Sequence, residues 1–294
     1  MSVTTSTTDD VQLGVHEHTD ARKSATLSAK EKRVRKTRSS WLKEPGRLFS
    51  MVPPLILGVI LLVGWYLGTT SGHTTSFFLP APGDVFSTLL DGIRSGIYFS
   101  NVLVTMQESM GGFLLALIVA LPLGYAVAKS RLLAAIIQPY LSAGQAIPAL
   151  VIAPLLIIWL GYGILPNIII CMLVVVFPMV INTVLGIRTI DHSLTDAARV
   201  EGAAGWSLLI HVEFPLALPA ILAAIRTGFT LSIVGALVGE IVSGGDQGLG
   251  SLVMLAKNQY NTPFMFATLV VLAALAAFYY SATWLLVKTA EWIY

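Results

Sequence analysis

The chain is constrained most by a series of apolar segments that are long enough to cross a lipid bilayer. A helix needs about 20 residues to cross ~30 Å of hydrocarbon, and six segments of this kind contain almost no charge. They are 52–67, 110–128, 133–160, 165–187, 220–242 and 264–287. Each is a continuous apolar run rather than an alternation of polar and apolar residues, which excludes a β-barrel. The pattern predicts an all-α membrane protein with six transmembrane helices.

The third segment contains residues that disturb helices. Pro139, Pro148 and Pro154 lack the backbone N–H that a helix interior uses, and Gly144 and Gln145 lie between them. Lipid tolerates a break only where neighbouring helices or a polar cavity satisfy the freed carbonyl groups. The sequence therefore predicts that the third helix is kinked or broken.

Charged residues are scarce and unevenly distributed. Hydrophobic residues make up 55% of the chain and charged residues 12%, against about 25% charged residues in an ordinary soluble domain. This composition excludes a coiled coil, a disordered chain and a strongly basic nucleic-acid-binding protein. With the N-terminus inside, fifteen of the 18 Lys and Arg residues face the cytoplasm, and only Arg94 and Lys257 face outward. The positive-inside rule thus predicts that both termini are cytoplasmic.

The domain division follows the charge. Residues 1–50 are rich in Ser, Thr and basic residues and predict a cytoplasmic, partly disordered basic tail, whereas 51–294 form the six-helix membrane domain. The basic run over 30–38 has two interpretations. It is a solvated topology signal, which we favour, or it docks on anionic lipid headgroups.

The loop between the fourth and fifth segments, at about 188–219, holds more charge than any other stretch of the membrane domain. Thr195 is placed to cap a short helix over 196–201, and Gly202 to end it or turn it sharply. A second short helix is predicted over 203–212, before a proline. Two small helices around a glycine form a knob that the groove of a partner could hold.

Several motifs occur in a fixed order along the chain. They are Leu79-Pro80-Ala81-Pro82, Ile147-Pro148, Pro154, Trp159-Leu160-Gly161-Tyr162-Gly163, Phe177-Pro178, Asn182-Thr183, Asp196-Ala197-Ala198, Gly202-Ala203, Pro215, Pro219, Gly239-Glu240 and Gly248-Leu249-Gly250. The loop portion resembles the Glu-Ala-Ala loop of permease subunits of bacterial binding-protein-dependent ABC importers. The series as a whole, over about 50–290, resembles the nitrate, sulfonate and taurine branch of that family.

In that family the loop forms coupling helices that sit in a cleft of the cytoplasmic ATPase and transmit its movement to the spans. The resemblance implies that the contact residues here are Asp196, Ala197, Ala198, Glu201, Gly202 and Ala203. Asp196 replaces the usual Glu, which keeps the charge and shortens its reach.

The resemblance also implies partners. This chain has no Gly-x-x-x-x-Gly-Lys-Ser/Thr phosphate loop, so we expect no cofactor on it and place ATP and Mg²⁺ on separate ATPase subunits. We further expect an extracytoplasmic solute-binding protein, a second permease copy or a paralogue, and a multi-pass location in the bacterial cytoplasmic membrane, with no nucleic acid.

Polar residues within membrane segments are candidates for the translocation pathway. The candidates are Glu108, Gln145, Asn182, Ser232 and Glu240. For Glu240, a pathway role and a structural hydrogen bond to a neighbouring helix are equally compatible with the sequence. Gln145 and Asn182 also suit helix packing. Arg226 is interpreted as a snorkelling residue close to the cytoplasmic entrance of the fifth helix.

Two departures from the branch concern the solute. Glu108 and Gln145 stand where these permeases often have Arg, and an anion would gain from the positive potential that is lost. A vitamin or heterocyclic precursor, of riboflavin or pyrimidine type, is therefore slightly favoured over an oxoanion such as nitrate, sulfonate or taurine.

Two other functional classes are weighed against an importer permease. An ion-coupled secondary transporter, kept as the alternative, needs a midplane carboxylate relay and usually an internal repeat, and neither is evident. A membrane enzyme needs a catalytic set, but the sequence offers no Ser/His/Asp arrangement and no ligand-spaced histidines. Cys171 is the single cysteine and excludes a Cys-based metal cluster. We expect transport without enzymatic activity on this chain.

Overall fold

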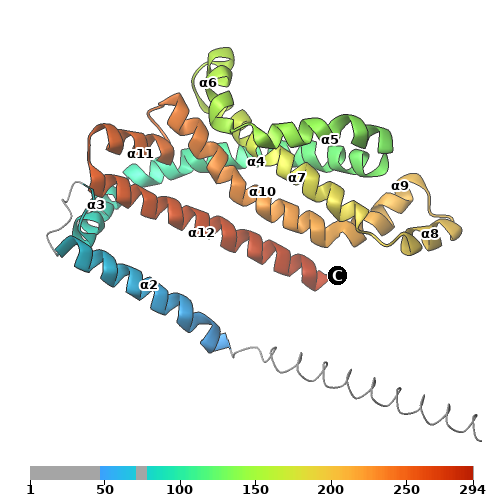
Figure 1. Ribbon diagram of the computed structural model, residues 1–294, viewed down its shortest axis with the longest axis horizontal. Helices are drawn as coiled ribbons and strands as arrows, with labels where there is room; N and C mark the ends of the chain where they lie inside the picture. The colour runs from blue at the N-terminus through green and yellow to red at the C-terminus, as the bar shows by residue number, and fades with distance from the viewer. Residues whose placement is uncertain (1–46, 71–77, 294) are drawn as a thin grey trace, which may run out of the picture. The chain divides into compact units, whose positions relative to one another are not determined.

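The computed structural model describes residues 47–70 and 78–293, and every regular element in these ranges is helical (Figure 1). The tail predicted over 1–50 lies outside the described residues up to residue 46. The elements are α2 (Arg47–Thr70), α3 (Pro82–Arg94), α4 (Ile97–Lys129), α5 (Arg131–Ala146), α6 (Ala149–Leu160), α7 (Ile164–Arg188), α8 (His192–Val200), α9 (Gly205–Leu208), the π-helix η1 (Leu209–Glu213), α10 (Phe214–Ser243), α11 (Leu249–Asn258) and α12 (Thr262–Ile293).

Four helical runs in the described part of the chain are long and apolar enough to cross a membrane. They are α4, α7, the run Gly205–Ser243 that contains α9, η1 and α10, and the first 28 residues of α12. The pair α5 and α6 makes a fifth if the two count as one, and α2 contains a shorter apolar stretch, Ile56–Thr70. The all-α membrane fold is confirmed for these residues, and each of the six predicted segments has a helical counterpart.

The third predicted segment is broken at one proline. α5 and α6 meet at an angle of 96°, and Ile147 and Pro148 between them are extended, with ψ angles of 117° and 129°. A residue that precedes proline is driven out of the helical region by a clash with the proline ring. Pro139 and Pro154 lie inside the two helices. The predicted break is thus confirmed at Pro148.

The core lies where α7 packs between α4 and α10 (Figure 1). Small residues permit this approach around the fully buried Cys171. A Cβ on Gly235 of α10 would lie 2.6 Å from the Cys171 Cα, and one on Gly112 of α4 would overlap the Cys171 side chain. Because lipid is as apolar as the side chains, close packing of small residues holds membrane helices together where the hydrophobic effect does not.

Aromatic rings attach α12 to this core. The Phe229 and Tyr279 rings stack with centroids 4.3 Å apart, and Phe113 meets Phe229 edge-on at 5.0 Å. The Tyr279 hydroxyl also shares a hydrogen bond of 2.8 Å with the Ser109 hydroxyl of α4. These contacts therefore join the three helices α4, α10 and α12.

The loop after α7 differs from the prediction at its start. α8 begins at His192 because the Asp191 carboxylate caps it, accepting a hydrogen bond of 2.9 Å from the Ser193 N–H. Thr195 lies inside α8, so the predicted cap at Thr195 is wrong. An acidic cap also interacts favourably with the positive end of the helix dipole.

The loop also differs at its end. The second helix does not stop at about residue 212, since α9, η1 and α10 form one run from Gly205 to Ser243. Pro215 has no N–H to donate to the carbonyl of His211, and the π-helical turn η1 directly precedes it. A π-turn shifts the hydrogen-bond register where an α-helical bond is missing, so the run continues past the proline.

Candidate functional site

The predicted contact residues lie on α8 and on the turn that follows it. Asp196, Ala197, Glu201 and Gly202 are exposed, and Ala198 and Ala203 are half-buried. The Asp196 carboxylate, 65% exposed, accepts a hydrogen bond of 3.2 Å from Arg199. The structure thus brings the six residues together on one protruding element.

Gly202 terminates α8 in a defined way. Its φ is +94°, in the left-handed region that favours glycine. The Ala203 N–H donates to the Ala198 carbonyl at 2.9 Å, and the Gly202 N–H donates to Arg199 at 3.0 Å. These two bonds form the Schellman motif, which satisfies carbonyl groups that the helix end leaves without partners. No neighbouring atom lies within 4 Å of a Cβ built on Gly202.

Large apolar side chains surround this turn and were not singled out by the sequence. Leu194 is 50% exposed, Val200 89% and Trp206 74%. Exposed apolar groups of this size, set among polar ones, are typical of a surface that a protein partner covers. The three residues are visible as apolar residues in the loop sequence. Whether they are exposed depends on which face of α8 packs on the spans, which the sequence does not show.

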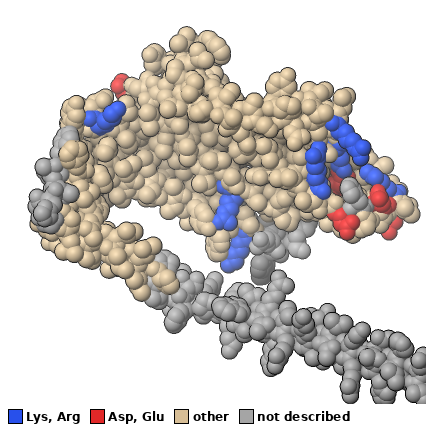
Figure 2. Space-filling view, viewed as in Figure 1, with Lys and Arg blue, Asp and Glu red and all other residues tan. Residues whose placement is uncertain are grey.

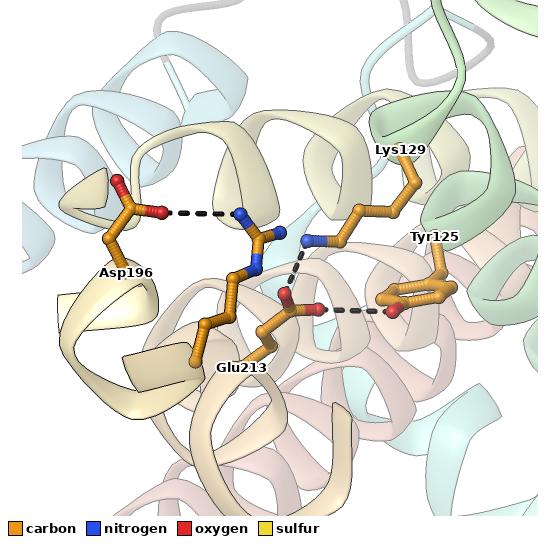
Figure 3. A network of polar contacts seen from close by, with 5 residues as sticks. Tyr125, Lys129, Asp196 and Glu213 are labelled. Atoms are coloured by element: carbon orange, nitrogen blue, oxygen red, sulfur yellow. Dashed lines mark hydrogen bonds and ion pairs between the residues drawn. The ribbon is translucent and has the colours of Figure 1, made fainter. Parts of the chain in front are cut away.

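Glu213 fastens the base of the loop to α4. The carboxylate is 1% exposed and accepts hydrogen bonds from Tyr125 Oη, at 3.0 Å, and from Lys129 Nζ (Figure 3). A buried carboxylate needs such partners because it has lost its hydration. The contacts of Glu213 were not predicted from the sequence, because its partners lie more than eighty positions away on another helix.

Glu240 lies at the other end of α10 and is fully buried. Its carboxylate accepts hydrogen bonds from Thr105 Oγ1 at 2.6 Å and from the Gly250 N–H at 2.5 Å. Two further N–H groups at the start of α11 are satisfied by α4, Gly248 by Asn101 Oδ1 and Leu249 by Thr105 Oγ1. Glu240 therefore helps to cap α11 and ties three helices together.

Glu108 lies beside Glu240 and is 2% exposed. Its Oε1 accepts a hydrogen bond of 2.9 Å from Asn167 Nδ2 of α7, whereas its Oε2 is buried without a hydrogen-bond partner among the described residues. Of the predicted pathway residues, Glu108 and Glu240 are the two buried acids, and both hydrogen-bond to side chains of neighbouring helices.

The other predicted pathway residues lie apart. Gln145 is exposed near the end of α5, and Asn182 is half-buried on α7. Ser232 is buried and donates to the Phe229 carbonyl of its own helix at 2.7 Å. No group of three or more His, Cys, Asp or Glu side chains that could hold a metal ion occurs among the described residues.

Arg226 does not lie near a helix start. It falls close to the middle of the run Gly205–Ser243, so its predicted place near the start of the fifth helix is wrong. The guanidinium lies 4.4 Å from the centroid of the Tyr280 ring. The error arose because the fifth helix begins much earlier than its apolar segment.

Comparison with known proteins identifies one family. The family model described as binding-protein-dependent transport system inner membrane component matches residues 112–290. A riboflavin transport system permease protein of Chloroflexus aurantiacus is 40% identical over 215 residues, covering 73% of this chain and 80% of that protein. A Bacillus subtilis protein that bears the name aliphatic sulfonates transport permease is 29% identical, covering 79% of this chain and 84% of that protein.

The fold resembles a solved transporter chain. A chain of the MetNI methionine ABC transporter, solved in inward-facing conformations, superimposes with a TM-score of 0.59 and 19% identity. The match covers 67% of this chain and 97% of the other.

Proposed function

Because this chain belongs to the family of binding-protein-dependent transport system inner membrane components, we propose that its loop at 188–219 transmits the movement of a separate ATPase to the spans. The chain is a permease subunit of an ABC importer and a multi-pass protein of the inner membrane. An ion-coupled secondary transporter is no longer an alternative.

The observation that carries this proposal is the continuous helix from the loop into the core. The run Gly205–Ser243 begins beside the exposed turn and continues past Phe229 to Glu240. A helix transmits displacement along its axis because its backbone hydrogen bonds resist bending. A push on α8 and α9 would therefore reach the buried Glu240 through α10.

The Glu213 contacts add a second path for the same movement. Glu213 links η1 to Tyr125 and Lys129 on α4. A movement of the loop would thus carry α4 together with α10, so that the two helices around α7 respond as one. Alternating access requires this kind of joint displacement.

The remaining assignments follow from the family. Permeases of this family work with an ATPase and a solute-binding protein. We propose six spans with both termini cytoplasmic, and a pair of permease subunits, identical or paralogous, around the solute path. ATP and Mg²⁺ would bind the ATPase subunits. Glu108, Gln145, Asn182, Ser232 and Glu240 remain the candidates for the path.

Substitution at Gly202 tests the coupling role. Gly202→Trp adds a large side chain to the open space at the turn. Gly202→Ala places a side chain at the same positive φ but adds only a methyl group. We expect Gly202→Trp to lose co-purification with the ATPase and ATP-driven uptake, and Gly202→Ala to keep both.

Gly244→Trp is the matched control, because Gly244 also has a positive φ and open space but lies at the other end of α10. If Gly202→Trp binds the ATPase as well as Gly244→Trp does, the loop is not the docking element.

The solute that we favour is riboflavin or a related heterocycle. The support is the 40% identity to the riboflavin permease protein and the absence of the cations expected at Glu108 and Gln145. Uptake of labelled riboflavin by cells that express the permease with its ATPase and binding protein tests this. Competition by unlabelled riboflavin but not by taurine is expected, and the reverse pattern would contradict it.

An anionic solute is the second candidate, and Arg226 is the observation that favours it. Its side chain lies near the middle of a helix against a tyrosine ring, with no ion pair to a described residue. A cation within a membrane helix is costly and is commonly part of a solute path. Under this alternative Arg226→Gln would abolish sulfonate uptake, whereas Arg94→Gln would not.

A further inference from the structure

A cavity lined by cations lies at the ends of α4 and α7. Its volume is about 590 Å³, within the range of ligand sites. Of the described residues that line it, four are basic and none is acidic. The lining consists of Ala128, Lys129, Arg131, Ile187, Arg188, Ile190, Thr195 and Arg199. The same end of the molecule shows a concentration of Lys and Arg on its surface (Figure 2).

The four cations are only partly neutralised. Lys129 pairs with Glu213 and Arg199 with Asp196, but neither carboxylate lines the cavity. The Arg188 guanidinium donates to the Val127 carbonyl at 3.3 Å, which leaves its charge uncompensated. The Arg131 side chain has no hydrogen bond or ion pair to any described residue. Like charges around one cavity repel, so an anion bound there would be stabilised by all four.

The backbone reinforces the preference for an anion. Arg131 is the first residue of α5, a helix of 16 residues, so the positive end of its dipole lies at the cavity. Ser130 satisfies one N–H of that first turn, accepting from Leu133 at 3.2 Å. The remaining free N–H groups of a helix start are donors suited to phosphate oxygens.

The position of the cavity indicates the source of the anion. Lys129 and Arg188 are the last residues of α4 and α7, two helices long and apolar enough to span a membrane, so the proposed topology places the cavity at the depth of the lipid headgroups. Ala128, Ile187 and Ile190 add an apolar wall beside the cations. A phosphate with glycerol and acyl chains attached matches both parts of this lining, whereas free phosphate matches only the cations.

We propose that this cavity binds the phosphate of an anionic phospholipid headgroup. Basic pockets between membrane helices are suited to such headgroups. The assignment rests on the proposed topology, which places the cavity on the cytoplasmic side, and goes beyond the transport function. Lipid bound there would contact α5, α7 and α8 at once and would hold α8 in place at the membrane surface.

Native mass spectrometry of the purified full chain in detergent tests the proposal, independently of transport. The protein is titrated with phosphatidylglycerol and with phosphatidylcholine, and retained lipid is measured. We expect phosphatidylglycerol to be retained preferentially. Arg131→Gln should weaken that retention about fivefold, the equivalent of about 1 kcal/mol for one cation, and Arg131→Gln with Arg188→Gln about 25-fold.

Arg94→Gln is the matched control, because Arg94 is an exposed cation at a helix end outside the cavity. Arg94→Gln should leave lipid retention unchanged. The basic tail is present in every variant, so the contribution of the tail to lipid binding cancels in the comparison. Equal loss in Arg94→Gln and Arg131→Gln would overturn the proposal.

Two further arms separate other occupants. If inorganic phosphate stabilises the chain through Arg131 while phosphatidylglycerol and phosphatidylcholine bind alike, the cavity takes a free anion and the proposal fails. If Arg131→Gln abolishes ATPase co-purification but leaves phosphatidylglycerol retention intact, the cations serve the ATPase, and the proposal also fails. The transport proposal can stand or fall separately, since it is tested at Gly202.

Discussion

Two buried glutamates at opposite ends of the same helical run are stabilised by different means. Glu213, near the loop, is held by the Lys129 ammonium and the Tyr125 hydroxyl. Glu240, at the far end, has no cationic partner among the described residues and is held by Thr105 and by an N–H at the start of α11. Full burial of a carboxylate therefore has at least two solutions in this protein, one ionic and one built from neutral donors.

The two glutamates also differ in how far water can reach their partners. Lys129 is 37% exposed, so water can reach the ion pair in the group of Glu213, Lys129 and Tyr125, which is the inner clamp in the proposed topology. The group of Glu240, Thr105 and Glu108, which is the outer cluster in the proposed topology, is buried, and Cβ atoms on Gly248 and Gly250 would overlap or crowd the Glu240 side chain. We infer that the inner end is built to move with the loop and that the outer end is built to stay packed. Three substitutions test this contrast.

Removal of the outer carboxylate has the largest expected effect. Glu240→Ala leaves the Gly250 N–H without its buried acceptor, removes the shorter of the two hydrogen bonds of the Thr105 hydroxyl and opens a cavity. We expect the free energy of unfolding to fall by about 4 kcal/mol, measured by thermal unfolding in detergent micelles. Asp246→Ala, at an exposed acid near the same end, should change it by less than about 0.5 kcal/mol. Similar stability of the two variants would contradict a structural role for Glu240.

Removal of the inner cation has an intermediate effect. Lys129→Met leaves the Glu213 carboxylate buried without its ion pair. We expect a loss of about 2 kcal/mol, below the value for a fully buried pair because Lys129 is partly exposed.

A double variant separates charge from packing at this site. Lys129→Met combined with Glu213→Gln removes both charges and should recover most of the lost stability in the same unfolding measurement. If the double variant is as unstable as the single one, packing of the lysine stem rather than the ion pair stabilises the clamp.

Neutralisation of the second outer acid has the smallest effect. Glu108→Gln keeps an oxygen that accepts from Asn167 and removes the charge of a carboxyl group whose second oxygen has no hydrogen-bond partner among the described residues. We expect a change within about 0.5 kcal/mol, because no cation depends on the Glu108 charge. A loss comparable to that of Glu240→Ala would mean that the cluster needs two negative charges, and that neutral donors do not explain the outer end.

Much of the fold could be predicted from apolar length and from proline. All six segments became helical, and the break in the third fell at one of its three prolines, Pro148, where the preceding residue leaves the helical region; Pro139 and Pro154 stay inside α5 and α6. Segment ends were less predictable. The second helix begins at Ile97 rather than near residue 110, since its first residues are polar on one face yet still packed on neighbours. α3 and α11, of 13 and 10 residues, lie outside the six segments because they are shorter than the length of about 20 residues by which the segments were chosen.

The candidate site was predictable in its loop but not in its supports. Asp196, Gly202 and their neighbours form one exposed turn because residues close in sequence stay close in space. Asn167, Thr105 and Tyr125 could not be paired with their glutamates, because a buried acid in a sequence shows that a partner must exist without showing which helix supplies it.

The sequence by itself determined that this chain is a helical membrane protein with one charged loop, since the cost of placing charge in lipid acts on each residue separately. Only the tertiary structure decided which acid meets a lysine, which meets a helix start, and that four cations share one cavity. Those outcomes depend on how α4, α7 and α10 pack, and packing is decided by close contacts between small residues far apart in the chain.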